Sequence, residues 1–209
     1  PFSDPTAEGP VIQAANLRAL KAGTTTDKVF ELVRKLRETI TIPMVFMTYA
    51  NVVFSYGSEK FLSKAAEAGI QGLILPDVPF EEKAEFEPLC AKYGLELVSM
   101  IAPPSHERLR SLAAEAKGFV YCVSSLGVTG VRSSITTDIG AMVKLVKETK
   151  AIPAAVGFGI STPEQAREMA QKADGVIVGS AIVKLIAANG RDSVEPVTEY
   201  VKAMKDAIR

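Results

Sequence analysis

Short apolar runs and amphipathic segments alternate along almost the whole chain. The apolar runs are rich in Val, Ile and Leu and alternate poorly with polar residues, which is typical of parallel strands buried on both faces. We expect six such strands, at 43–49, 72–76, 95–101, 118–123, 153–156 and 175–178. Between and around them, helical spacing of apolar residues predicts helices at 11–22, 58–68, 81–93, 105–116, 138–149, 163–172, 181–188 and 194–208. A further helix, capped by Thr26-Asp27, carries an apolar face from Val29 to Ile40.

Strict alternation of strand and helix leaves two fold classes, an open doubly wound sheet or a closed barrel. The turn Gly157-Phe158-Gly159 lacks a third glycine and comes late, which disfavours a dinucleotide-binding fold. A closed barrel of this kind has eight strands and typically ~250 residues. We therefore predict a single domain over residues 1–209, an α/β (β/α)8 TIM barrel incomplete at the N-terminus, with its first two βα units missing. A six-stranded open sheet is the alternative.

Two glycine turns near the end of the chain suggest a phosphate site. Gly157 and Gly159 follow one strand, Gly179 and Ser180 follow the next, and each turn opens a helix. Without Cβ atoms in the way, backbone N–H groups can point at one anion, and a helix N-terminus adds its positive end. In barrels, a phosphate often binds at the loops after the last two strands. Alternatively, these glycines only end the strands.

Composition removes several function classes. The 24 Lys and Arg balance the 24 Asp and Glu, so no global field attracts nucleic acid or an anionic membrane. Cys90 and Cys122 form no CxxC pair, and His106 is the single histidine, so we expect no metal site. Two cysteines in a chain of this size fit a reducing compartment, and we expect a cytoplasmic protein. No apolar run reaches the ~18 residues of a membrane span.

Carboxylates and a tyrosine follow or lie in the expected strands. Glu8 lies in the opening Pro-rich loop, Asp77 follows the second strand, and Tyr121 lies within the fourth. Carboxylates beside a phosphate site suit proton transfer on a sugar phosphate. Each also has a plainer reading, since Asp77 suits a turn, Tyr121 suits a core, and Asp4 and Glu8 suit a loop. The loop from Ser124 to Thr137 is long for a connection between a strand and a helix, which is typical of a lid. Thr129 would be able to close over the carboxylates.

Six motifs together strongly resemble the tryptophan synthase α subunit family, over the whole chain and in family order. They are PFSDPTAEGP at 1–10, YAN at 49–51, PDVPFEE at 76–82, SSLGVTG at 124–130, GFGIS at 157–161 and GSAIVK at 179–184. The last two motifs occur across phosphate-binding barrels, but the combination is highly specific.

The resemblance implies a lyase that splits indole-3-glycerol phosphate into indole and glyceraldehyde 3-phosphate by retro-aldol cleavage, without a cofactor in this subunit. It implies that Glu8 helps to remove the indole N–H proton. Many relatives have Asp at this position, so the charge is kept but the reach changes. A second family carboxylate, which handles the proton at indole C3, lies on the strand before PFSDP. The 209 residues do not contain it, and we expect this fragment to be inactive alone.

The resemblance also implies the remaining site residues. Asp77 and Tyr121 would line the substrate pocket, and Thr129 would belong to the closing loop. The phosphate would be held by Gly130, Gly157, Gly159, Gly179 and Ser180. The partner would be a β subunit that carries pyridoxal phosphate and faces Asp4, Pro5 and Asn51.

Two other functions stay open at this point. The same two glycine turns could bind the substrate phosphate in a sugar-phosphate isomerase or epimerase. The chain could also be a non-catalytic subunit that activates its partner.

Overall fold

The computed structural model describes residues 1–102, 106–123, 138–157 and 159–209. The chain divides into two compact units, and each is described by itself. Unit 1 comprises Pro1–Thr6 and Asn16–Ser99, and unit 2 comprises Ala7–Ala15 and Met100–Arg209. The expectation of one domain over residues 1–209 is not tested by this division and stays a prediction. No helix in the described part of the chain is both long and apolar enough to cross a membrane.

Unit 1 is built on a three-stranded sheet with the order β1-β2-β3, in which both strand pairs are parallel. Its elements are α2 (Thr26–Arg37), β1 (Val45–Met47), α3 (Ala50–Tyr56), α4 (Ser58–Glu67), β2 (Gly72–Ile74), η1 (Phe80–Glu85), α5 (Glu87–Lys92) and β3 (Glu96–Leu97). Helix α1 (Pro10–Lys21) has residues in both units.

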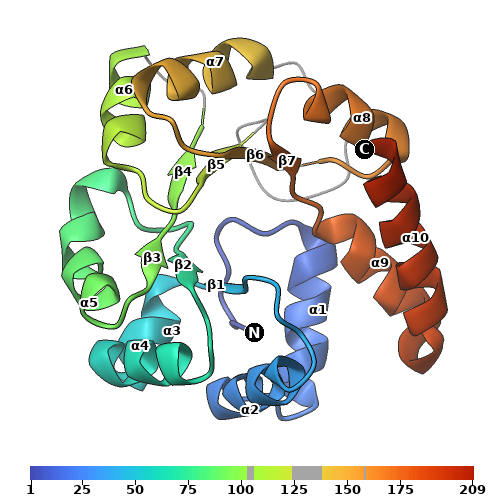
Figure 1. Cartoon of the computed structure of the whole chain (residues 1–209). Helices are drawn as coiled ribbons and strands as arrows, with labels where there is room; N and C mark the ends of the chain where they lie inside the picture. The colour runs from blue at the N-terminus through green and yellow to red at the C-terminus, as the bar shows by residue number, and fades with distance from the viewer. Residues whose placement is uncertain (103–105, 124–137, 158) are drawn as a thin grey trace. The chain divides into compact units, whose positions relative to one another are not determined.

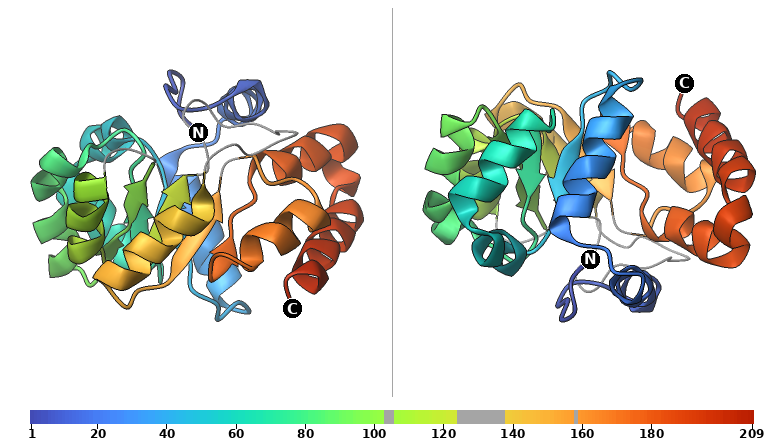
Figure 2. Two further views of the ribbon diagram at one scale, coloured as in Figure 1. Left: turned by 90° about the horizontal axis from the view of Figure 1, so that it is seen from above. Right: turned by 90° about the horizontal axis from the view of Figure 1, so that it is seen from below.

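Unit 2 is built on a four-stranded sheet with the order β4-β5-β6-β7 (Figure 1). Its elements are β4 (Ser99–Ile101), α6 (His106–Glu115), β5 (Val120–Val123), α7 (Ile139–Thr149), β6 (Ala154–Gly157), α8 (Pro163–Ala170), β7 (Gly175–Val176), α9 (Ser180–Asn189), η2 (Gly190–Asp192) and α10 (Val194–Ala207). Strands β5, β6 and β7 pair in parallel. The views in Figure 2 agree with Figure 1 that α10 lies beside α8 and α9.

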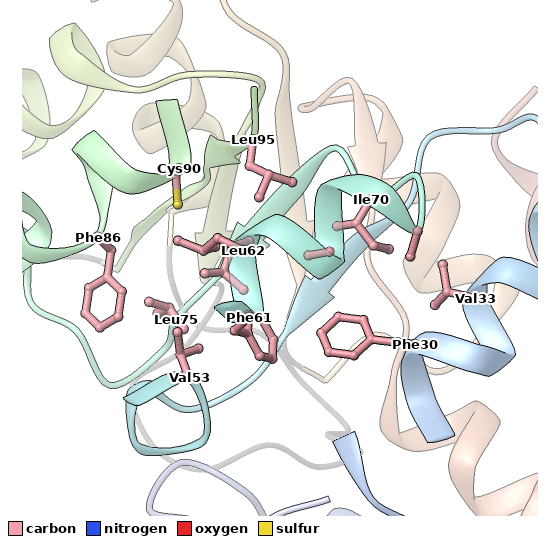
Figure 3. Close-up of a cluster of buried hydrophobic side chains, with 13 residues drawn as sticks. Phe30, Val33, Val53, Phe61, Leu62, Ile70, Leu75, Phe86, Cys90 and Leu95 are labelled. Carbon is pink, nitrogen blue, oxygen red and sulfur yellow. The ribbon is translucent and has the colours of Figure 1, made fainter. Parts of the chain in front are cut away.

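The predicted burial of the strands is confirmed where the runs are most apolar. Every residue of β2 and β5 is buried, because helices cover a parallel sheet on both faces. In unit 1 the hydrophobic core contains several aromatic side chains. The ring centroids of Phe30 and Phe61 lie 5.3 Å apart. Figure 3 shows Leu62, Leu75 and Phe86 in the same cluster.

Several predicted bounds are wrong, and three of the differences are informative. The run 95–101 forms two strands, so the described residues contain seven: the Val98 amide still bonds to Leu73 O at 2.9 Å, and the chain then passes to the other sheet. The segment 81–93 forms η1 and α5, because Pro88 lacks an N–H and restricts the residue before it. The cap of α2 is Thr25, whose hydroxyl accepts from Lys28 N at 3.3 Å.

One segment to which the sequence analysis assigned no helix or strand is helical. Residues 50–56 follow β1 and form α3, which ends at Gly57 with φ of 92°. The YAN motif therefore lies at the start of a helix rather than in an open loop.

A carboxylate joins the strands of unit 2 to α7. One oxygen of Asp174 accepts from Ala154 N at 2.7 Å, at the start of β6. The other accepts from Lys147 Nζ at 2.6 Å, on α7. The Lys147 ammonium and the Ala154 amide lower the pKa of Asp174 below its ordinary 3.8, because both favour the charged carboxylate.

Candidate active site

The ring of Tyr121 packs directly against Gly157 on the neighbouring strand of unit 2. In the β5–β6 register, Tyr121 lies opposite Ala155 and Val123 lies opposite Gly157. A Cβ built on Gly157 would lie 2.7 Å from Cζ of Tyr121, and nearer still to the hydroxyl. Real Cβ atoms do not approach that closely, so a side chain at position 157 would displace the ring. Gly157 therefore has a packing role as well as its position in the turn.

Tyr121 is held in its neutral form. Its side chain is 5% exposed, and burial raises its pKa to about 12. A phenol with that pKa keeps its proton at neutral pH and can donate a hydrogen bond. Tyr121 thus suits a substrate-orienting group better than a base. The sequence alone also allowed a core role for Tyr121, and deep burial is compatible with both readings.

From Gly159 to the start of α8, the chain is fixed by its backbone conformation, by burial and by a helix cap. Gly159 has φ of 97°, a backbone conformation that side chains other than glycine rarely adopt. Ile160 is 3% exposed and anchors the turn in the core. Thr162 caps α8 by accepting from Gln165 N, and the Gln165 side chain accepts in return from Thr162 N. Such a capping box fixes the start of a helix.

The turn after β7 leads into the N-terminus of α9. Gly179 is the N-cap, and Ser180 is the first helical residue. Within the described residues, no atom lies within 4 Å of a Cβ built on Gly179, so open space faces this glycine. The first N–H groups of an α-helix have no intrahelical acceptor, and they suit an anion. Of the four predicted phosphate-binding residues that the structure describes, Gly157 ends β6, Gly159 follows it, and Gly179 and Ser180 follow the adjacent strand β7.

Glu8 belongs to the same unit as these strands. It is half-buried, and its backbone carbonyl accepts from Gln13 Nε2 at 2.8 Å. That bond ties the end of the opening loop to the first turn of α1. The role of the Glu8 carboxylate in proton transfer stays a prediction.

Asp77, in unit 1, accepts a hydrogen bond at the start of a helix, whereas the sequence indicated only that it suits a turn. Its exposed carboxylate accepts from Ala50 N, with both oxygens at 3.1 Å. Ala50 is the first residue of α3, so Asp77 stabilises the N-terminus of that helix. Its predicted contact with substrate stays a prediction.

The three residues predicted to face the β subunit also lie in unit 1. Asp4 accepts a hydrogen bond from the Ser3 hydroxyl and is exposed. Pro5 is half-buried, and Asn51 is exposed on α3. The opening loop is fastened nearby, because the Phe2 ring lies 5.2 Å from the buried ring of Tyr49. The sequence analysis placed Tyr49 in the YAN motif but did not predict this aromatic contact.

The remaining predicted residues, Thr129 and Gly130, lie in 124–137, outside the described residues. Within the described residues, no group of three or more His, Cys, Asp or Glu side chains could hold a metal ion. Cys90 and Cys122 are buried, and neither forms a disulfide. Burial raises the pKa of Cys122 to about 12, which makes it unsuitable as a nucleophile.

A family model described as "Tryptophan synthase alpha chain" matches residues 1–209. The tryptophan synthase alpha chain of Lacticaseibacillus casei is 44% identical over 208 residues, covering 100% of this chain and 78% of that protein. The tryptophan synthase alpha chain of Lactiplantibacillus plantarum is 47% identical over 209 residues, covering 100% of this chain and 79% of that protein.

Solved structures are similar over the same span. A structure from Aquifex aeolicus VF5 has 40% identity and a TM-score of 0.90, covering 100% of this chain and 79% of that chain. A structure from Pyrococcus furiosus, described as the structural basis of mutual activation of the tryptophan synthase a2b2 complex, has 35% identity and a TM-score of 0.89. That match covers 99% of this chain and 84% of the solved chain.

Proposed function

This chain belongs to the tryptophan synthase alpha chain family, and from that membership we propose how it performs the lyase reaction of the family, the cleavage of indole-3-glycerol phosphate into indole and glyceraldehyde 3-phosphate. The predicted fold class is confirmed, since the matching structures place the chain among (β/α)8 barrels rather than open sheets. Family membership also favours the lyase over the sugar-phosphate isomerase and over a subunit that only activates its partner.

The observation that carries the proposal is the order of the strands in unit 2. Tyr121 lies on β5, the Gly157 and Gly159 turn follows β6, and the N-terminus of α9 follows β7. Because β5, β6 and β7 are parallel neighbours, their carboxyl ends share one edge of the sheet. A ligand at that edge can have its phosphate beside the two glycine turns and its other end beside Tyr121.

At the phosphate end, binding needs donors and no side chains in the way. The N–H groups at Gly159, Gly179 and Ser180 supply donors, and the start of α9 adds a positive partial charge. Gly130 completes the set by resemblance. The phosphate lies away from the bond that breaks. Its binding energy holds the substrate so that the reacting end is correctly oriented toward the acid–base groups.

At the indole end, Glu8 accepts the indole N–H proton when the family's second carboxylate, which the 209 residues do not contain, delivers a proton to indole C3. As the bond from C3 to the glycerol chain breaks, the glycerol hydroxyl loses its proton to form the aldehyde, and Glu8 returns its proton to the indole nitrogen. A positioned base of this kind contributes about 10²–10⁴ in rate. Tyr121 stays protonated and orients the ligand. Because this residue is buried, water has little access to it. By the family resemblance, Asp77 contributes a substrate contact and Thr129 belongs to the closing loop.

The partner of this chain is the tryptophan synthase β subunit. The structure of the relative from Pyrococcus furiosus is described as that of an a2b2 complex, and this chain covers 84% of the matched chain. We place pyridoxal phosphate in the β subunit and no cofactor in this chain. Asp4, Pro5 and Asn51 form part of the surface that meets the partner. Two buried cysteines that form no disulfide suit a cytoplasmic location.

The test is turnover by the full-length protein with its β subunit. Purified protein is incubated with indole-3-glycerol phosphate, and indole and glyceraldehyde 3-phosphate are measured separately. Equal amounts of both products are expected, because the cleavage splits one substrate into two. Turnover of a ribulose phosphate or phosphoribosyl substrate with no indole would instead identify an isomerase or epimerase. Stimulation of the β subunit with no cleavage would identify an activating subunit.

A further inference from the structure

The turn between β6 and α8 is fastened on two sides by side chains that none of the assigned roles includes. On one side, Tyr200 of α10 donates its hydroxyl to Ser161 O at 2.9 Å. On the other side, Gln165 Oε1 accepts from Ser161 N at 2.8 Å and from the Ser161 hydroxyl at 3.1 Å. Both the carbonyl and the amide of Ser161 are thus held, two residues after Gly159.

The fastening joins the turn to rigid elements. Gln165 lies in the first turn of α8, where the capping box with Thr162 fixes its direction. Tyr200 lies on α10, which packs against α8 and has Met204 buried one turn later. Burial raises the pKa of the Tyr200 hydroxyl above its ordinary 10.0, so the hydroxyl keeps its proton and donates at neutral pH. Figure 1 shows α8 and α10 side by side.

We infer that Tyr200 and Gln165 are positioning residues for phosphate binding, because they fix Ser161 and thereby the backbone donors of the Gly159 turn. This inference rests on the proposed function, since it concerns the phosphate site of the same reaction. An N–H group binds an anion well only when its direction is fixed before the anion arrives. A turn that must be ordered on binding loses part of that affinity. Tyr200 and Gln165 reach the phosphate only through Ser161, so neither is a catalytic residue.

The test compares Tyr200→Phe with a matched control. The variant removes one hydroxyl and leaves the ring, so the fold of α10 is kept. The control is Tyr93→Phe, which removes a hydroxyl that donates to Glu59 at 2.9 Å within unit 1, whereas the glycine turns belong to unit 2. Glycerol 3-phosphate and inorganic phosphate are the probes, titrated by calorimetry into the full-length protein with its β subunit. The Km and kcat for indole-3-glycerol phosphate are measured on the same samples.

For Tyr200→Phe we expect a Kd for glycerol 3-phosphate about threefold to tenfold higher, the range that one hydrogen bond supplies. Km should rise by the same factor while kcat stays within about twofold, since the proton-transfer groups are untouched. Tyr93→Phe should match the unchanged protein. Gln165→Met, which keeps the side-chain volume and removes the acceptor, should weaken both probes as Tyr200→Phe does.

Unchanged Kd values in both Tyr200→Phe and Gln165→Met would overturn the inference. Equal weakening by Tyr200→Phe and Tyr93→Phe would also overturn it, because it would report a general loss of stability. If the unchanged protein binds neither probe and forms no indole, the proposed function fails, and this inference fails with it. Binding of both probes by the unchanged protein, with no effect of either variant, refutes the positioning role alone.

Discussion

The Tyr121 ring occupies the space where a side chain at position 157 would lie, so these two residues on adjacent strands constrain each other. The glycine lets the ring approach the turn that follows β6, and the ring covers the glycine. Because both residues belong to the proposed site, the packing of the sheet and the placement of a substrate-orienting hydroxyl have one structural cause.

Gly157→Ala should therefore lower the free energy of unfolding by about 1–3 kcal/mol, the usual cost of an added methyl group in a packed site. In a protein that already carries Tyr121→Ala, the same change should cost much less, because the ring is gone. Unfolding in urea of the four proteins measures both costs. An equal cost in both backgrounds would show that the ring is not the obstacle.

The matched control is Gly175→Ala on the adjacent strand β7. A Cβ there would lie 3.8 Å from the Ala155 side chain, an ordinary contact. We expect a change within about 1 kcal/mol, since removing a glycine also lowers the entropy of the unfolded chain.

Asp174→Asn should reduce stability at neutral pH but not in acid. The folded protein lowers the pKa of this carboxyl below 3.8, so its stabilising contribution is present above the unfolded value and is lost as the pH falls through the folded value. The difference between the unchanged protein and the variant should shrink below about pH 4. Denaturant titrations at several pH values measure it, and a constant difference from pH 7 to pH 3 would contradict the explanation. The control is Glu148→Gln, which removes the exposed ion pair of Glu148 with Lys144, 3.8 Å apart. This variant should change the stability little at any pH.

Asp77→Ala should destabilise the protein by about 0.5–2 kcal/mol, because it removes the acceptor for the first amide of α3. Asp77→Asn keeps one oxygen and should cost less. Urea unfolding distinguishes the two. If Asn and Ala cost the same, the hydrogen bond to Ala50 is not what Asp77 contributes.

Cys90 and Cys122 should not react with a thiol reagent in the folded protein. They are 1% and 0% exposed, and the reactive thiolate of Cys122 is disfavoured by a pKa of about 12. Both should react fully in denaturant. Peptide mapping after labelling checks this, and prompt labelling of either residue in the native protein would contradict the burial.

Part of this molecule could be read from the sequence. Apolar runs of four to eight residues separated by amphipathic segments predict the order of strands and helices, since both periods are local properties. The two glycine turns were also predictable, because Gly157 ends β6, and Gly159 and Gly179 each follow a strand and precede a helix. Their role in phosphate binding stays a prediction. Boundaries failed where a single residue decided them, as Pro88 does inside the segment 81–93.

The contacts that fix the site were not predictable, because they join residues far apart in the sequence. Asp77 caps a helix that begins 27 residues earlier, and without that acceptor the YAN segment reads as loop. Tyr200 reaches Ser161 over 39 residues. The packing of Tyr121 on Gly157 depends on the register of β5 and β6, which no local pattern reveals.

The most direct measurement is steady-state indole formation from indole-3-glycerol phosphate by Glu8→Gln, in the full-length protein with its β subunit. The account predicts that kcat falls by about 10²–10⁴, because the amide cannot accept the indole N–H proton. The Kd for glycerol 3-phosphate should stay within about twofold, because the phosphate end is untouched. Glu8→Asp, which keeps the carboxylate, should keep activity. A Glu8→Gln protein with unchanged kcat would contradict the account.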